Sequence, residues 1–208
     1  PLLERGAQIA FINDAIGDPA MHAHLLEFDS VHGRWPAEFA ADVDAISIDG
    51  TRIPVNSTRT LEDLPLDGVD VVIDCTGAFK TEASLAPYFA AGVKKVIVSA
   101  PVKDGPTANI VYGVNEGIYD PATHQIITAA SCTTNCLAPV VKVLLEGIGI
   151  KHGSITTIHD VTNTQTIIDR PAKDLRRARS ALTNLIPTTT GSATAITLID
   201  PELTGKLN

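Results

Sequence analysis

The sequence predicts an α/β protein with a mainly parallel sheet, and two observations support this fold class. Short β-branched apolar runs recur at strand length: QIAFIND, DAISIDG, TRIPVN, DVVIDCTG, KKVIVSAP, NIVYGVN and QIITAA. Helix-like segments such as HAHLLEF and TEASLAPYFAAGV lie between some of these runs, which is the rhythm of βαβ units. The pair Asp49-Gly50 separates two strand-like runs and predicts a hairpin with a two-residue turn, so the sheet is expected to be mixed.

The segments from residue 132 onward predict a long helix followed by a change of texture. Apolar residues in helical positions predict a mostly buried helix over residues 132–148, with Ser131 as its N-cap; they are Leu137, Val140, Val141, Val143, Leu144 and Leu145. Next, GSITTIHDVT predicts a strand, RPAKDLRRARS is basic and polar, and NLIPTTTGSATAITLI ends in a helical stretch. We therefore expect a domain boundary near residues 129 to 133.

Composition narrows the class of protein. A length of 208 residues allows one domain or a domain and a half, and no apolar run approaches the roughly 20 residues of a membrane helix. The net charge of −8 argues against non-specific binding to nucleic acid. Three cysteines are too few for a disulfide framework. The first residues lack both an initiating Met and the pattern of a signal peptide, so we expect a cytoplasmic protein whose beginning is missing.

Cys132 is a candidate nucleophile because of its expected place in the first turn of a helix. Unpaired backbone N–H groups and the positive end of the helix dipole favour a thiolate there, and the same N–H groups suit an oxyanion. The alternative is a buried, inert cysteine, against which the polar flanks SCTTN argue. Cys136 is interpreted as structural and Cys75, inside an apolar run, as core packing. The Cys132–Cys136 spacing alone does not make a metal site, and we predict none.

His159 follows the strand-like TTIH and precedes a polar stretch, so it is expected to project from a sheet edge. A lone histidine there is usually structural, but a cysteine nucleophile needs a nearby base. Asp14 ends the first strand-like run, where a dinucleotide-binding fold has the acid that binds the adenine ribose. A carboxylate there would repel a 2′-phosphate, which favours NAD over NADP; the alternative is an ordinary turn residue.

Two polar segments suit anions. Thr188, Thr189, Thr190 and Gly191 precede a helical stretch and offer hydroxyls and backbone N–H groups for a phosphate, or an ordinary N-cap. The basic run of Lys173, Arg176, Arg177 and Arg179 is most often a solvated surface, although arginine also suits phosphate.

Residues 130–144, ASCTTNCLAPVVKVL, resemble the active-site segment of the glyceraldehyde-3-phosphate dehydrogenase family. Further segments match in order and spacing: IND at 12–14, EFDSVHGRW at 27–35, CTGAF at 75–79, VIVSAP at 96–101, TTIHDVTNTQ at 156–165, KDLRRAR at 173–179 and PTTTGSA at 187–193. The resemblance spans essentially the whole chain. It implies an incomplete Rossmann-type NAD-binding domain at residues 1–131, without its first strand and glycine loop, and the start of an α+β catalytic domain at residues 132–208.

The resemblance also implies roles for individual residues. Cys132 corresponds to the nucleophile and His159 to its base. The positions at or beside NAD are Asp14, Thr76, Gly77, Phe79 and Ser99. The positions that line the inorganic phosphate site are Ser131, Thr133, Thr190 and Gly191. Thr162 corresponds to a contact of the substrate's own phosphate, and Arg177 to a loop bordering the cofactor and a subunit interface. The family implies a homotetramer for the full-length protein.

The implied reaction is the NAD-dependent oxidation of glyceraldehyde 3-phosphate to an acyl phosphate through a thiohemiacetal and a thioester. Asp160, Val161 and Thr164 depart from the family's usual pattern, and Thr164 stands where an acid is common. With EFDSVHGRW and PTTTGSATAI, they resemble the branch associated with arsenic resistance, in which arsenate replaces phosphate and the product is 1-arseno-3-phosphoglycerate. The alternatives are an erythrose-4-phosphate dehydrogenase and a non-catalytic family member used as a binding protein.

Overall fold

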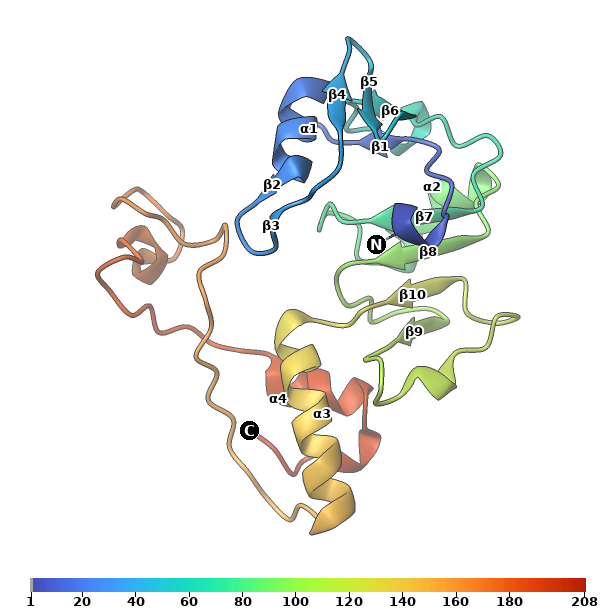
Figure 1. Cartoon of the computed structure of the whole chain (residues 1–208). Helices are drawn as coiled ribbons and strands as arrows, with labels where there is room; N and C mark the ends of the chain where they lie inside the picture. Colours follow the sequence, from blue (N-terminus) through green and yellow to red (C-terminus); the bar gives the residue numbers. More distant parts are fainter. Residues whose placement is uncertain (1) are drawn as a thin grey trace. The chain divides into compact units, whose positions relative to one another are not determined.

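A computed structural model describes residues 2–208, which divide into two compact units. Within the described residues, unit 1 comprises residues 2–72 and Ala83–Val96, and unit 2 comprises Ile73–Glu82 and Ile97–Asn208. Figure 1 labels the helices and strands along the chain. No helix in the described part of the chain is both long enough and apolar enough to cross a membrane.

The sheet of unit 1 is mixed. Its strands, in the order β1-β6-β5-β4, are β1 (Ile12–Asn13), β6 (Thr51–Asn56), β5 (Ala45–Ile48) and β4 (Phe39–Ala41). β1 pairs with β6 in parallel, whereas β5 is antiparallel to both β4 and β6. Ile48 pairs with Thr51 across the β5–β6 turn, and Asp49 and Gly50 have φ values of 48° and 78°. Two positive φ values match a primed two-residue turn, so the predicted hairpin and the mixed sheet are confirmed.

Helix α1 (Pro19–Glu27) packs on this sheet. Asp18 caps it by accepting a hydrogen bond from the Met21 N–H at 2.8 Å, and Pro19 stands at the first helical position, where its missing N–H costs nothing. A small core joins helix and sheet; its buried members are Ala23, Ile46, Ile48 and Ile53. Nearby, β2 (Phe28–Asp29) and β3 (Gly33–Arg34) form a two-stranded ribbon.

A second four-stranded sheet has the order β7-β8-β10-β9. Its strands are β7 (Val71–Asp74), β8 (Lys95–Val98), β10 (Ile126–Thr128) and β9 (Thr107–Asn109), and helix α2 (Glu82–Ala90) lies between β7 and β8 in the chain. β9 and β10 are parallel. The strand predicted at NIVYGVN is wrong beyond Asn109, because the Val111 carbonyl accepts from the N–H groups of Val114 and Asn115 in a turn.

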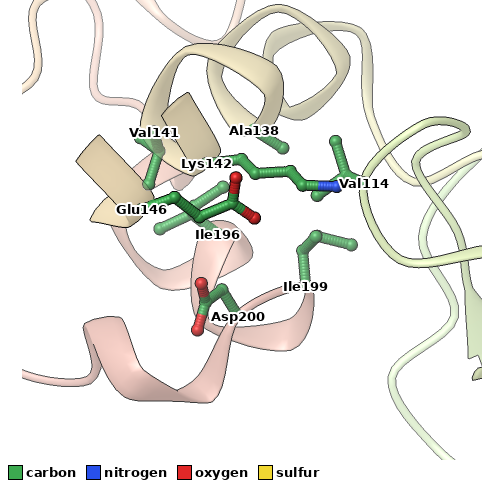
Figure 2. Close-up of a pocket in the computed structure, with 8 residues that line it drawn as sticks. All are labelled: Val114, Ala138, Val141, Lys142, Glu146, Ile196, Ile199 and Asp200. Carbon is green, nitrogen blue, oxygen red and sulfur yellow. The ribbon is translucent and has the colours of Figure 1, made fainter. Parts of the chain in front are cut away.

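The core of unit 2 lies between helix α3 (Cys132–Gly147) and the segment that contains α4 (Ser192–Ala195). Its buried residues are Val111, Ala130, Ala138, Val141, Ile196, Ile199 and Leu203. A cavity of about 120 Å³ borders this core; Figure 2 shows the residues that line it, including Lys142, Glu146 and Asp200. The expectation of a mostly buried helix is wrong for part of α3, since Val140 and Val143 are 56% and 70% exposed.

Residues 149–191 contain little regular structure, and the strand predicted at GSITTIHDVT is wrong. Gly153 makes an isolated bridge with Leu207. Near His159, however, backbone N–H groups donate to side chains that are close in the sequence. The Val161 N–H donates to Asp160 Oδ1 and the Thr162 N–H to Gln165 Oε1. A strand needs a neighbouring backbone for these groups, and local side-chain acceptors take its place here. Figure 1 shows the long irregular path of this segment.

The remaining short elements are 3-10 helices. Their bounds are η1 (Leu3–Arg5), η2 (Leu61–Asp63), η3 (Glu116–Ile118), η4 (Leu175–Ala178), η5 (Ile196–Leu198) and η6 (Pro201–Leu203).

Candidate active site

Cys132 is the first residue of α3, as the sequence predicts. Ser131 has an extended backbone and caps the helix, with its Oγ accepting a hydrogen bond from the Thr134 N–H at 3.1 Å. The N–H groups of the first helical turn lack intrahelical acceptors and mark the positive end of the dipole. The Cys132 sulfur therefore starts from a position that stabilises negative charge.

A buried hydrogen-bond network holds the turn that leads into Cys132. Ala130 is buried and has a φ of 54°, a left-handed conformation that is uncommon for residues other than glycine. Its N–H donates to Thr128 Oγ1 at 3.0 Å, and Thr128 Oγ1 in turn donates to Asn109 Oδ1 at 2.7 Å. Asn109 Nδ2 completes the network by donating to the Val102 carbonyl at 2.8 Å. The conformation of Ala130 is thus held by Thr128, which is in turn held by Asn109.

The Cys132 sulfur lies 3.3 Å from Nε2 of His159. On the other side of the imidazole, Nδ1 lies 2.8 Å from the backbone carbonyl of Asp160. A carbonyl oxygen can only accept, so Nδ1 carries the proton and Nε2 faces the sulfur ready to take one. Cys132 and His159 are both exposed to solvent.

The contact between Cys132 and His159 shifts the pKa values of both side chains. The hydrogen bond between His159 and Cys132 is the main cause that lowers the pKa of Cys132, with a smaller contribution from Thr133, whose Oγ1 lies 3.9 Å from the sulfur. The pKa of His159 is raised, first by the backbone carbonyl of Asp160 and then by its hydrogen bond to Cys132. These shifts favour the thiolate and imidazolium forms, the arrangement of an activated cysteine nucleophile.

A second group of polar side chains gathers in the turn at residues 162–165. The Thr162 hydroxyl lies 2.8 Å from the Thr164 hydroxyl and donates to Gln165 Oε1, also at 2.8 Å. Arg177 Nη1 donates to Thr164 Oγ1 at 2.6 Å. Thr162 and Arg177, which the sequence predicts as site residues, are therefore linked through Thr164, which it does not predict as one. The Gln165 N–H donates to the Thr162 carbonyl at 3.1 Å. This hydrogen-bonded turn brings the side chains of Thr162, Thr164 and Gln165 together.

Thr190 and Gly191 lie at the start of the four-residue helix α4, with Gly191 as its N-cap residue. Thr190 Oγ1 accepts from the Ser192 N–H at 3.2 Å and lies 2.6 Å from Ser192 Oγ. The Thr190 hydroxyl therefore accepts from one N–H group at the start of α4, whereas the N-cap residue, Gly191, makes no side-chain cap hydrogen bond.

The expected cofactor residues lie in loops after strands. Asp14 follows β1 in unit 1, is exposed and accepts from the Ile16 N–H at 3.0 Å. In unit 2, Thr76, Gly77 and Phe79 follow β7, and Thr76 donates its hydroxyl to Asp74 Oδ1 at 2.7 Å. Gly77 has a φ of 66° with open space where a Cβ would be. Ser99 follows β8, and its N–H donates to the Asp74 carbonyl.

The other two cysteines are free and exposed. The prediction that Cys75 packs in the core is wrong, because it comes directly after β7 ends at Asp74 and so lies outside the strand. Within residues 2–208, no group of three or more His, Cys, Asp and Glu side chains is arranged to hold a metal ion.

Thr164 and Gln165 belong to the polar cluster at 162–165 but were not nominated as site residues. The signal that could have found them is local: a Thr-x-Thr-Gln run in a turn brings its first, third and fourth side chains together. The buried network of Asn109 and Thr128 had no such signal, because these residues are 19 apart in the chain.

Two family models match the chain. Residues 2–82 match the model described as the NAD binding domain of glyceraldehyde 3-phosphate dehydrogenase, and residues 131–208 match the model of its C-terminal domain. The NAD-binding match includes Asp14 and the loop after β7, and the C-terminal match includes Cys132 and His159.

Curated relatives carry the same family name. The chain is 59% identical over 203 residues to glyceraldehyde-3-phosphate dehydrogenase 3 of Nostoc sp., covering 97% of this chain and 60% of the relative. It is 51% identical to glyceraldehyde-3-phosphate dehydrogenase of Streptomyces coelicolor, covering 100% of this chain and 62% of the relative. It is 48% identical to glyceraldehyde-3-phosphate dehydrogenase 1 of Bacillus subtilis, covering 97% and 60%. The chain thus spans about three fifths of the length of these relatives.

Proposed function

Because this chain belongs to the glyceraldehyde-3-phosphate dehydrogenase family, we propose that the native protein oxidises glyceraldehyde 3-phosphate with NAD. The observation that carries the proposal is the 3.3 Å approach of His159 Nε2 to the Cys132 sulfur at the start of α3. A cysteine with a depressed pKa beside a base is the arrangement required to attack an aldehyde carbon.

The first chemical step uses these two residues. The Cys132 thiolate attacks the aldehyde carbon, and the N–H groups at the start of α3 stabilise the negative charge that forms on the former carbonyl oxygen. The imidazolium of His159 gives its Nε2 proton to this oxygen, which completes the thiohemiacetal. His159 then takes the proton of the thiohemiacetal hydroxyl through Nε2, because Nδ1 is committed to the Asp160 carbonyl. When bound, NAD accepts the hydride that turns the thiohemiacetal into a thioester.

The residues present fit NAD. Asp14 presents an exposed carboxylate at the end of β1, a strand parallel to its neighbour β6, and a carboxylate in this place suits a ribose diol and repels a 2′-phosphate. Gly77 leaves open space in the loop after β7, so a ligand can approach the backbone closely. With Asp14, we propose Thr76, Gly77, Phe79 and Ser99 as cofactor residues.

An oxyanion completes the reaction by attacking the thioester and releasing Cys132. We propose that this oxyanion binds beside Ser131, Thr133, Thr190 and Gly191, and that the substrate's own phosphate binds at Thr162 with Arg177 nearby. With phosphate the product is 1,3-bisphosphoglycerate. Arsenate is nearly isosteric with phosphate, and we propose it as the alternative oxyanion, supported by Asp160, Val161 and Thr164, which depart from the family's usual pattern.

Location and assembly follow from the same proposal. We propose a cytoplasmic homotetramer, in which the basic loop of Arg176, Arg177 and Arg179 lies near a subunit interface. We also propose a functional division into a cofactor domain at residues 1–131 and the first part of a catalytic domain at residues 132–208.

The test is an assay of the native full-length protein. NADH formation from glyceraldehyde 3-phosphate and NAD is followed by absorbance with phosphate or arsenate, in parallel with a Cys132→Ser variant and a matched Cys136→Ser control. We expect turnover that is abolished in Cys132→Ser and kept in Cys136→Ser, because Cys136 lies about one helical turn along α3 from Cys132. A higher kcat/KM for arsenate than for phosphate would favour the arsenate route.

Three outcomes would contradict the proposal. Turnover of erythrose 4-phosphate without turnover of glyceraldehyde 3-phosphate would replace the substrate. A folded protein that binds NAD but oxidises neither aldehyde would point to a non-catalytic binding protein. Equal loss of activity in the two cysteine variants would point instead to a site that uses both thiols.

A further inference from the structure

Asn135 lies on α3 one turn after its start and ties the helix to the chain that leads into it. Its side-chain Nδ2 lies 2.6 Å from the Ala129 carbonyl and 2.9 Å from the Ser131 carbonyl. An amide nitrogen donates and a carbonyl accepts, so both contacts are hydrogen bonds given by Asn135. One side chain of the helix therefore holds the two carbonyls on either side of Ala130.

The first of these bonds acts on the strained turn. Ala130 has a φ of 54°, which an L-residue other than glycine rarely adopts unless its surroundings enforce it. In the peptide unit before it, the Ala129 carbonyl accepts from Asn135. At the other end of the same unit, the Ala130 N–H donates to Thr128 Oγ1 at 3.0 Å. A peptide unit is planar and stiff, so hydrogen bonds at both ends fix its orientation.

The second bond acts on the peptide unit between Ser131 and Cys132. The Ser131 carbonyl accepts twice from one residue, from the Asn135 backbone N–H at 2.9 Å and from its Nδ2. The N–H at the other end of this unit belongs to Cys132. Because the unit is planar, the two bonds to its carbonyl also set the direction of that N–H and the place of the Cys132 Cα. The side chain of Asn135 therefore determines where the sulfur starts from.

The exposure of Asn135 indicates that these bonds have a local effect. The residue is exposed, so water can replace its partners, and the bonds contribute little to global stability. Their effect is on the contact between the Cys132 sulfur and His159 Nε2, which lie 3.3 Å apart. A misplacement of about 1 Å can lower the rate of an enzyme about a hundredfold.

We propose that Asn135 is a positioning residue, which holds the strained turn at Ala130 and thereby aims the Cys132 sulfur at His159. The inference rests on the proposed function, in which Cys132 attacks the aldehyde and His159 is its base. Asn135 acts through the backbone of residues 129–132 and takes no part in the proton transfers. Without its amide, two carbonyls lose a donor, the turn relaxes, and the sulfur moves away from the imidazole.

The experiment measures chemistry and stability separately in the native full-length protein. Wild type, Asn135→Ala and Asn135→Gln are compared by kcat and KM for NADH formation from glyceraldehyde 3-phosphate and by urea unfolding. The rate of iodoacetamide alkylation at Cys132 is measured across pH, with the site identified by peptide mass spectrometry. Lys142→Met is the matched control, because it removes another hydrogen bond from α3 to a backbone carbonyl, that of Gly113 at 3.0 Å, away from Cys132.

We expect Asn135→Ala to lower kcat about tenfold while KM stays within about twofold, because the binding groups remain and only the reacting atoms are misplaced. The alkylation profile should move towards higher pH, since the imidazole no longer lies close enough to stabilise the thiolate. The urea midpoint should change little. Asn135→Gln keeps an amide donor and should recover part of the lost kcat. Lys142→Met should keep the native kcat and the native alkylation profile.

Three results would overturn the inference. The first is a native kcat with a native alkylation profile in Asn135→Ala. The second is an equal loss of kcat in Lys142→Met, which would indicate a general effect of weakening α3. The third is a lower kcat in Asn135→Ala that comes with a lower urea midpoint and an unchanged alkylation profile, which is the result of a merely structural role.

The alkylation profile also separates this inference from the function on which it rests. A wild type that does not oxidise glyceraldehyde 3-phosphate overturns the proposed function, whereas a shifted profile in Asn135→Ala would still support the role of Asn135 and an unshifted one would overturn it. If Asn135→Ala fails to fold, Asn135→Asp replaces it, because a carboxylate cannot donate to either carbonyl. A lower kcat in that variant supports the inference, and a native kcat overturns it.

Discussion

The two members of the proposed catalytic pair are held in opposite ways. Cys132 follows a buried network in which Thr128 hydrogen-bonds to both Asn109 and Ala130, and Ser131 caps its helix. His159 lies in a long irregular segment, exposed, with its imidazole bonded to the next backbone carbonyl. The nucleophile is therefore placed by the fold, whereas the base is placed by local contacts. Changes on the two sides should separate stability from activity.

The largest effect is expected at the sulfur. Cys132→Ser replaces the thiolate with a hydroxyl whose pKa is far too high for attack at neutral pH. Oxidation of glyceraldehyde 3-phosphate by the full-length protein should fall at least about a thousandfold, measured as kcat for NADH formation. Urea unfolding should hardly move, since the side chain is exposed. Retention of a tenth of the activity would remove Cys132 from the role of nucleophile.

The next largest effect is expected at the base. His159→Asn removes the Nε2 partner of the thiolate and should lower kcat about a hundredfold, within the range of general-base catalysis. Because His159 is exposed, the free energy of unfolding should change by less than about 0.5 kcal/mol. Circular dichroism during urea unfolding checks the second value. A large loss of stability would show that His159 is held by the fold and not only by local contacts.

The opposite result is expected in the buried network. Thr128→Val keeps the shape of the side chain but leaves Asn109 Oδ1 and the Ala130 N–H without their partner. The free energy of unfolding should fall by about 2 kcal/mol, the cost of orphaned buried polar groups. Thr183→Val, at an exposed threonine, is the control and should lie within about 0.5 kcal/mol of the wild type. Equal urea midpoints for the two variants would contradict the assigned role of the network.

The smallest effect is expected at the helix cap. Ser131→Ala removes the acceptor for the Thr134 N–H and should lower stability by about 1 kcal/mol, whereas Ser131→Asn should recover most of it. The same variant sharpens the comparison, because the cap also shapes the first turn that carries Cys132. An alanine variant with native stability would mean that another acceptor replaces the hydroxyl.

Local signals in the sequence predicted the hairpin of unit 1 and the start of the helix that carries Cys132. The Asp49-Gly50 hairpin, the mixed sheet, the α3 start and the Ser131 cap are confirmed, because each depends on a few adjacent residues. The predicted burial of α3 was too high. An apolar pattern shows which face of a helix is apolar, and not whether another element covers that face.

The base side was less predictable from local patterns. GSITTIHDVT has the composition of a strand, but a strand also needs a partner, and the neighbouring side chains bond the backbone instead. His159 was nominated as a base, yet its 3.3 Å distance to Cys132 joins residues 27 apart in the chain. The Asn109–Thr128–Ala130 network was missed for the same reason. Long-range contacts leave no periodic trace in a sequence.

The most direct test of the proposed pair is the pH dependence of Cys132 alkylation. Rates with iodoacetamide are measured across pH in the full-length protein and in His159→Asn, with Cys136→Ser and Cys75→Ser in both to isolate the signal. The imidazole lowers the pKa of the Cys132 thiol from its ordinary 9.0, so alkylation of the wild type should begin at lower pH and be lost only as pH falls through that depressed value. In His159→Asn the profile should move towards higher pH. Coincident profiles would show that His159 does not activate the sulfur, and the central claim would fail.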